Sequence, residues 1–166
     1  MKNNKDTEVH VVIITVENKP GVLARIAGLF SARGYNIDSL CVSETEDPSI
    51  SKVTMTMKGD ARILEQIYKQ LNKLIDVIKV SDHSQQASIH RELALVKISC
   101  PAPKRGEILQ LADLFQAEVA DVALKSITFA VKGDSEKIDR FIELTTPYGI
   151  KESMRTGLVS ILKDKD

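Results

Sequence analysis

Two kinds of apolar pattern alternate along the first half of the chain. The run over 9–16, VHVVIITV, is rich in β-branched residues and predicts a buried strand. Residues 18–21 interrupt it, and from Val22 apolar side chains recur at the spacing of a helix, which Gly34 is expected to end as its C′ residue. The same criteria predict the remaining elements: strands over 36–43, 50–57 and 75–80, and a helix after Gly59-Asp60. The order β-α-β-β-α-β is typical of the ferredoxin-like split βαβ fold.

The second half of the chain repeats this order. Its predicted elements are strands over 93–99, 118–124, 126–132 and 148–162, and helices that follow Gly106 and cover 134–145. The last strand carries a break near Thr156 and Gly157, where a bulge or turn is the simplest interpretation and a contact to a partner is the alternative.

The two halves can be aligned residue by residue. Gly21 corresponds to Gly106 at an offset of 85 residues. Gly59 corresponds to Gly133 at an offset of 74. The difference falls in the loop over 44–51 of the first half, and an insertion in a hairpin loop is well tolerated. The alignment indicates that both halves share one architecture.

These patterns predict an α+β protein made of two tandem ferredoxin-like βαββαβ domains. The first domain is expected over 1–82 and the second over 93–166. Residues 83–92 between them are polar and contain Gln85-Gln86, as expected of a linker. The end of this segment, His90-Arg91-Glu92, is expected to be a solvated stretch at the edge of the second domain.

Composition and charge narrow the classes of function. Lys plus Arg and Asp plus Glu each number 23, so the formal net charge is zero, and a phosphate-binding nucleic-acid protein usually has a basic excess. No apolar run approaches the ~18 residues of a membrane span, and the polar start of the chain lacks an apolar signal core. We therefore expect a cytoplasmic protein that binds neither nucleic acid nor membrane. Cys41 and Cys100 lie in strand-like stretches and are expected to be buried thiols.

The candidate ligand-binding residues lie in the first half of the chain and include Asn18, Gly21 and Asn36. Asn18 follows the first strand and Asn36 opens the second, and we expect both at the same end of one sheet, beside the start of a helix. Free backbone N–H groups and the helix dipole favour a carboxylate, and Asn offers a donor and an acceptor. The pattern therefore indicates a site for a small zwitterion such as an amino acid. At the 85-residue offset Pro103 and Asp121 replace the two asparagines, so only the first half keeps this constellation.

Simpler interpretations exist for each of these residues. Asn18 and Gly21 are also typical of a turn, Asn36 of a strand start, and capping alone is about as probable as a ligand site. The three histidines have no metal-binding spacing, and no GxSxG, P-loop or GxGxxG motif is present. The acids over 44–47 could pair for acid–base work, but a charged loop tip is the preferred interpretation. We expect no catalytic site and no metal site.

Several segments together resemble the small, regulatory subunits of acetohydroxyacid synthase, also called acetolactate synthase, which begin with an ACT domain. The segments that carry this resemblance are NKPGVLAR (18–25), LFSARGYNIDSL (29–40), LEQIYKQLNKL (64–74), RELALVK (91–97) and RTG (155–157). The resemblance runs from about residue 8 to residue 162.

The resemblance implies a function for the chain. In that family the small subunit has no catalytic site, forms dimers through its ACT domains, and activates a separate large subunit that uses thiamine diphosphate, magnesium and FAD. It also confers feedback inhibition by valine, which lies between two ACT domains, at the turn after the first strand of one chain and the second strand of the other. Carried over, the valine-binding residues are Asn18, Gly21, Val22, Asn36 and Ile37, with Val22 and Ile37 expected to bound the branched side chain. The second domain is then expected to contact the large subunit.

Three other classes of function stay open at this point. A stand-alone ACT-type sensor would bind an amino acid and act on some other protein. An enzyme in its own right would need a catalytic cluster that the sequence does not show. A nucleic-acid binder using the open face of a sheet is disfavoured by the zero net charge and the 4% aromatic content.

Overall fold

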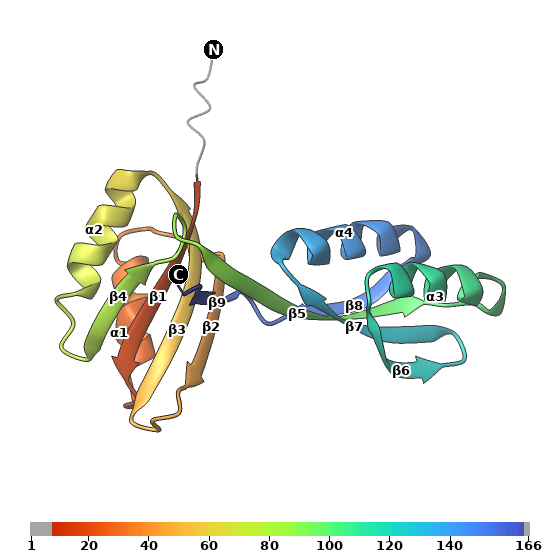
Figure 1. Cartoon of the computed structure of the whole chain (residues 1–166), viewed down its shortest axis with the longest axis horizontal. Coiled ribbons are helices and arrows are strands. Elements are labelled where there is room, and N and C mark those ends of the chain that lie inside the picture. Colours follow the sequence, from red (N-terminus) through yellow and green to blue (C-terminus); the bar gives the residue numbers. More distant parts are fainter. Residues whose placement is uncertain (1–7, 165–166) are drawn as a thin grey trace, which may run out of the picture. The chain divides into compact units, whose positions relative to one another are not determined.

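The predicted order of elements is present in both halves of the chain. The computed structural model describes residues 8–164, so the first seven and the last two residues of the predicted domains lie outside the described part. The first half contains β1 (Glu8–Glu17), α1 (Val22–Ser31), β2 (Ser39–Glu44), β3 (Ile50–Gly59), α2 (Ala61–Leu71) and β4 (Val77–Asp82). Its strands form an antiparallel sheet in the order β2-β3-β1-β4 (Figure 1). This is the split βαβ topology that the pattern predicted.

The second half has the same topology with additions. It contains β5 (Ser88–Ser99), the short 3-10 helix η1 (Ala102–Lys104), α3 (Arg105–Leu114), β6 (Glu118–Ala123), β7 (Ser126–Gly133), α4 (Ser135–Thr145), a second short helix η2 (Thr146–Tyr148), β8 (Ile150–Arg155) and β9 (Val159–Leu162). The sheet order is β6-β7-β5-β8, and β9 pairs with β5 outside this path. The predicted break in the last strand is confirmed, because β8 ends at Arg155 and Gly157 has a φ of +81°.

Each half has its own hydrophobic core between its sheet and its helices. In the first, the alternate residues Val12, Ile14 and Val16 of β1 belong to this core, and Val11 and Ile13 on the other face of the strand are buried as well. Its largest fully buried side chains include Phe30, Ile14, Ile26, Met55 and Ile67. In the second, Phe141 of α4 meets Phe129 of β7 edge to face, with ring centroids 6.1 Å apart. Figure 1 shows α3 and α4 on one side of that sheet.

Helix caps repeat between the halves. Asp60 precedes α2, and its Oδ1 accepts a hydrogen bond of 2.8 Å from the N–H of Ile63. Asp134 precedes α4 and accepts one of 2.9 Å from the N–H of Lys137. Both follow a glycine that ends a strand, which confirms the 74-residue offset in structural terms. The end of α1 also agrees with the prediction: Gly34 has a φ of +68°, and its N–H and that of the next residue donate to the carbonyls of Ser31 and Phe30, a Schellman motif.

The segment predicted as a linker, 83–92, is strand in its second half, because β5 begins at Ser88. Only residues 83–87 separate β4 from β5, and His83 continues beside β1 because its N–H donates to the carbonyl of Val11 over 2.8 Å. The chain divides into one compact unit up to Ile89 that also takes in the residues from Ser160, and a second unit over 90–159. The end of the chain, predicted within the second domain, is therefore grouped with the first. The N–H of Lys163 donates to the carbonyl of Ala87.

Candidate functional site

Asn18 joins the turn after β1 to the hairpin between β2 and β3. Its N–H donates to the carbonyl of Ser49 over 2.7 Å. Its side-chain amide donates to Glu44 Oε1 and to the carbonyl of Pro48, both over 2.9 Å. The side chain is exposed, so the amide holds the turn at the surface of the sheet end rather than within the core.

Gly21 starts α1 in a conformation that favours glycine. Its φ is +85°, in the left-handed region, and no side chain caps the helix, whose first turn contains no acidic residue. The amides at the start of α1 therefore keep their partial positive charge without a side-chain acceptor. The N–H of Val22 donates to the carbonyl of Lys19 over 3.4 Å, so a carboxylate at this point would meet the next N–H groups of the first turn and a favourable dipole.

Val22 and Ile37 both pack on the first core. Val22 is 4% exposed and belongs to that core. Its side chain therefore faces away from the surface of the turn, and a contact from Val22 to a ligand would come from its backbone. Ile37 is half-buried against the same core. Of the two side chains expected to border the ligand, that of Ile37 is therefore better placed than that of Val22.

Asn36 precedes β2 rather than opening it. The predicted strand over 36–43 starts three residues later, at Ser39. Asn36 is exposed, and its amide donates to Asp38 Oδ1 over 3.1 Å. This bond within the loop uses one of the two N–H donors of the amide, and the pairing with β3 begins only beyond Asn36.

The strand register places the two ends of β2 unambiguously. At one end, Glu17 of β1 and Glu44 of β2 face the first two residues of β3. At the other end, Val11 of β1 and Ser39 of β2 both face Thr56. β1 and β2 are each antiparallel to β3, so they run parallel to each other. The start of β2 therefore lies beside the start of β1.

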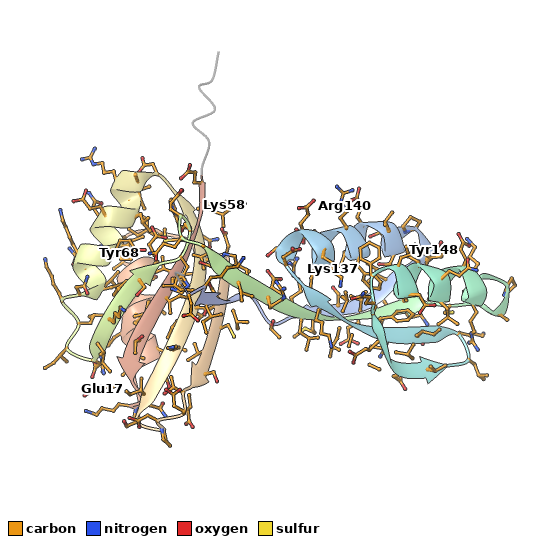
Figure 2. The ribbon with its side chains drawn as sticks, in the orientation of Figure 1. Glu17, Lys58, Tyr68, Lys137, Arg140 and Tyr148 are labelled. Carbon is orange, nitrogen blue, oxygen red and sulfur yellow. The ribbon has the colours of Figure 1, made fainter. Side chains whose placement is uncertain are left out.

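Asn18 and Asn36 consequently lie at opposite ends of the sheet. Glu17, the residue before Asn18, is at one end of the sheet, and Lys58, near the end of β3 that faces the start of β2, is at the other (Figure 2). The prediction that one chain brings both asparagines to the same end is wrong. The physical reason is that α1 carries the chain back along the sheet, as a crossover between parallel strands must.

β2 is an edge strand with regular pairing. Its six residues face β3 in succession without a register shift, and no strand of residues 8–164 lies on its other side. The N–H of Thr45, just beyond β2, donates to the carbonyl of Ile50. By the alternation of an antiparallel ladder, the backbone groups of Leu40, Val42 and Glu44 face the free edge. The side chain of Val42, in the middle of this strand, is 42% exposed.

The equivalent turn of the second half is built differently. η1 contains Pro103, which has no N–H, in the position of Asn18. The hairpin after β6 is held by Arg105 instead, whose Nη2 donates to the carbonyls of Ala123 and Leu124, both over 3.0 Å. The second half thus keeps a tie between turn and hairpin but not the Asn and Gly of the first.

A network of charges fixes the end of β8. Arg155 donates from Nε and Nη2 to Glu92 Oε2 over 3.0 and 2.6 Å, and from Nη1 to Asp139 Oδ1 over 2.6 Å. The hydroxyl of Ser135 donates to the other oxygen of Glu92. Glu92 is buried, so the prediction of a solvated stretch is wrong for this residue. The sequence contained no local signal for this, because the partner of Glu92 is distant in the chain. The turn at 156–157 is tied to β5, because the N–H of Thr156 donates to the carbonyl of Leu93 over 3.0 Å. A contact of this turn to a partner stays a prediction.

The remaining candidates for chemistry do not converge. Asp47, in the charged loop tip, accepts hydrogen bonds from the N–H and hydroxyl of Ser49, which lower the pKa of its carboxyl group. This is the behaviour of a turn residue rather than of an acid catalyst. Residues 8–164 contain no group of three or more His, Cys, Asp or Glu side chains placed to hold a metal ion. Among the same residues, no helix is long and apolar enough to cross a membrane.

Comparison with known proteins identifies the family. Residues 12–79 match the AHAS small subunit-like ACT domain, and residues 91–164 match the family described as small subunit of acetolactate synthase. The chain is 50% identical over 153 residues to the probable acetolactate synthase small subunit of Methanothermobacter thermautotrophicus, covering 92% of this chain and 91% of that protein. The chain belongs to the acetolactate synthase small subunit family.

Further similarities extend this assignment within the small subunit family. The probable acetolactate synthase small subunit of Archaeoglobus fulgidus is 48% identical over 154 residues, 93% of this chain and 96% of that protein. The crystal structure of the small subunit from Thermotoga maritima superposes with a TM-score of 0.88 at 35% identity, covering 96% of this chain and 99% of that one. As a small subunit, the chain is a regulatory and non-catalytic component of the synthase.

Proposed function

We propose that this small subunit binds valine between the ACT domains of two copies and thereby confers feedback inhibition on a large catalytic subunit, which it also activates. The observation that supports this proposal is the position of the two asparagines. They lie at opposite ends of a sheet whose edge strand, β2, is unpaired on one side in the described residues. A site that needs both residues must therefore draw one from each of two chains.

Antiparallel pairing of β2 with β2 of a second copy brings the required residues together. Centred on Val42, such pairing sets Glu44 of one copy opposite Leu40 of the other, so that their free backbone groups face each other. Asn18 is hydrogen-bonded to Glu44, and Asn36 lies four residues before Leu40. Because a two-fold axis repeats every contact, each dimer has two equivalent sites.

The groups at each site match the parts of an amino acid. The uncapped start of α1 at Gly21 offers N–H groups to the carboxylate. The Oδ1 of Asn18, whose two N–H donors are already bonded, is an acceptor for the ammonium group. The second copy's Asn36 offers a further acceptor, and its second N–H is a donor for the remaining carboxylate oxygen. Ile37 supplies apolar surface for a branched side chain. Discrimination of one methylene is worth only ~1–3 kcal/mol, so leucine and isoleucine are expected to bind more weakly than valine.

Inhibition follows from linkage between the effector and the catalytic partner. Valine favours one arrangement of the ACT pair and the large subunit favours another, so valine inhibits only by the difference between its affinities for the two arrangements. The thiamine diphosphate, magnesium and FAD of the reaction belong to the large subunit under this proposal. Contact of the second domain with that subunit, and a cytoplasmic location, are further parts of the proposal.

Calorimetric titration of the purified small subunit with valine tests the effector. We expect saturable heat from the wild type and none from Asn36→Ala. Asp121→Ala, at the 85-residue sequence offset from Asn36 and within β6 of the second half, is the control and should bind valine like the wild type. An Asn36→Ala subunit that activates the large subunit and stays fully valine-sensitive would contradict the site.

Subunit mixing tests whether the site is shared between chains. In a heterodimer of Asn18→Ala with Asn36→Ala, one shared site carries both substitutions and the other carries none. Titration of that heterodimer should therefore recover half of the wild-type binding stoichiometry, although each homodimer binds no valine. If each site were built within one chain, both sites would stay defective and no binding would return.

A further inference from the structure

A single buried residue, Asp76, is bonded to both ends of the turn that carries Asn18 and Gly21. Asp76 lies between α2 and β4 and is 7% exposed. Its carbonyl oxygen accepts a hydrogen bond of 2.9 Å from the N–H of Glu17, the last residue of β1. Its side-chain Oδ2 accepts two from Arg25, from Nε over 2.9 Å and from Nη2 over 2.6 Å.

Arg25 in turn lies directly under the turn. It is in the first turn of α1, and its N–H donates to the carbonyl of Gly21 over 3.0 Å. Its Nη1, which is not bonded to Asp76, lies 3.3 Å from the position that a Cβ of Gly21 would occupy. The ion pair thus holds a guanidinium group, and its positive charge, beside the α-carbon of Gly21.

The second half shows that the fold does not require this ion pair. There the N–H of Ser99 donates to the carbonyl of Gly149 over 2.8 Å, which reproduces the backbone bond between Glu17 and Asp76. Gly149 has no side chain, and Gln110 stands at the 85-residue offset from Arg25. The backbone part of the arrangement is therefore common to both halves, whereas the charged part occurs only beside the turn with Asn18 and Gly21.

Simple stabilisation is a poor explanation for the charged part. Burying a carboxylate costs desolvation energy, and a buried ion pair often contributes no more stability than apolar residues of the same volume would. Arg25 keeps about half of its side chain exposed, which weakens the pair further as a source of stability. The two hydrogen bonds from Nε and Nη2 to one carboxylate oxygen do, however, fix the position of the guanidinium group closely.

We propose that Arg25 and Asp76 are a positioning pair that sets the affinity of the turn for its amino-acid effector. The inference rests on the proposed valine site and adds two residues to it. Asp76 fixes both ends of the turn, and Arg25 keeps a positive charge beside Gly21, where the carboxylate of the effector would bind. The turn is then already in its binding conformation before the effector arrives, which lowers the ordering cost of binding.

Valine titrations of the full-length small subunit test the pair, with the variants Asp76→Asn, Arg25→Gln and their combination. Each single variant should weaken valine binding by about tenfold or more, the usual effect of losing a charged hydrogen bond. The double variant should be little worse than either single one, because both act through one contact. Gln110→Ala, at the equivalent site of the second half, is the control and should bind like the wild type.

Activation of the large subunit separates positioning from mere folding. A positioning role predicts that the variants still activate the large subunit fully while their half-inhibiting valine concentration rises. If the Arg25 and Asp76 variants bind valine like the wild type while Asn36→Ala does not bind it, this inference is overturned and the proposed function stays intact. Absence of valine binding in the wild type would overturn both. If Asp76→Asn does not fold, the half-exposed Arg25→Gln still decides between these outcomes.

Discussion

The two halves of this chain share a fold and differ at the places where a ligand or a second copy would bind. Both have the same strand order, and Asp60 and Asp134 cap equivalent helices. They differ at the turn after the first strand, where Gly21 with its positive φ precedes α1 in the first half and η1 precedes α3 in the second. Neither helix has a side-chain cap, but α3 has Glu107 in its first turn and α1 has no acidic residue there. Features present in both halves serve the common fold, whereas a feature present in one half only is a candidate for a role specific to that half.

The edge strands show the same contrast. β2 pairs with β3 over six successive residues, whereas the pairing of β6 with β7 is shifted between Val119 and Asp121. An irregularity of this kind bends an edge strand and protects it from pairing with other chains. In addition, Glu118 of β6 forms an ion pair with Lys132 of the neighbouring strand. The comparison indicates that the edge strand of the first half is regular enough to pair with another strand, whereas the edge strand of the second half is irregular and less suited to pairing.

The largest expected effect concerns the independence of the two cores. Phe141→Ala should lower the free energy of unfolding of the second unit by about 3–5 kcal/mol, because a fully buried ring is replaced by a cavity. Valine binding, assigned to the first unit, should persist. Differential scanning calorimetry with hydrogen exchange would locate the loss. Phe30→Ala is the matched change in the first unit, and equal loss of protection in both units from either variant would contradict independent cores.

An intermediate effect is expected at the edge strands. Val42→Lys places like charges near the two-fold axis of the proposed dimer and removes apolar contact, so the dimer should weaken by about tenfold. Analytical ultracentrifugation at several concentrations measures this. Val122 is the structural equivalent in β6, because Val42 faces Val53 and Val122 faces Ile127, which lies 74 residues later. Val122→Lys should leave the oligomeric state unchanged, and an equal effect of both substitutions would remove the distinction between the edges.

The smallest expected effect tests what the halves have in common. Asp60→Ala and Asp134→Ala should each cost about 1 kcal/mol of stability in their own unit, because each removes one side-chain acceptor from a helix N-terminus. Thermal unfolding of the two variants measures the cost. Equal costs are expected, since the two bonds have nearly equal lengths of 2.8 and 2.9 Å. A cost confined to one variant would show that the caps are equivalent in position only.

Features that depend on neighbours in sequence were predicted correctly. The helix ends at Gly34, Asp60 and Asp134 follow from local chemistry, and the sheet order follows from the succession of elements. The candidate turn residues Asn18 and Gly21 were also found in this way, since turns have local signatures. The break after Arg155 is another such case.

Features that depend on distant partners could not be predicted in this way. The buried state of Glu92 depends on Arg155, which lies 63 residues later. Without knowledge of that partner, the segment over 88–92 was interpreted from its polar composition as part of a linker. Asp76 was predicted within the strand over 75–80, and no pattern near it indicated its contacts to Glu17 and Arg25, which lie 59 and 51 residues earlier. The error over the two asparagines was different, because the parallel direction of β1 and β2 already follows from the crossover helix.

The uncapped start of α1 has a consequence for the lifetime of the protein in the cell. α2 and α4 carry their own caps, whereas under the proposed function the carboxylate of valine completes α1. A ligand that binds only the folded state adds about 2.7 kcal/mol of stability at a hundred times its dissociation constant. Such a gain would lower the fraction of unfolded chains that proteases degrade. Supply of the amino acid would then set the abundance of its own regulator as well as the activity of the enzyme.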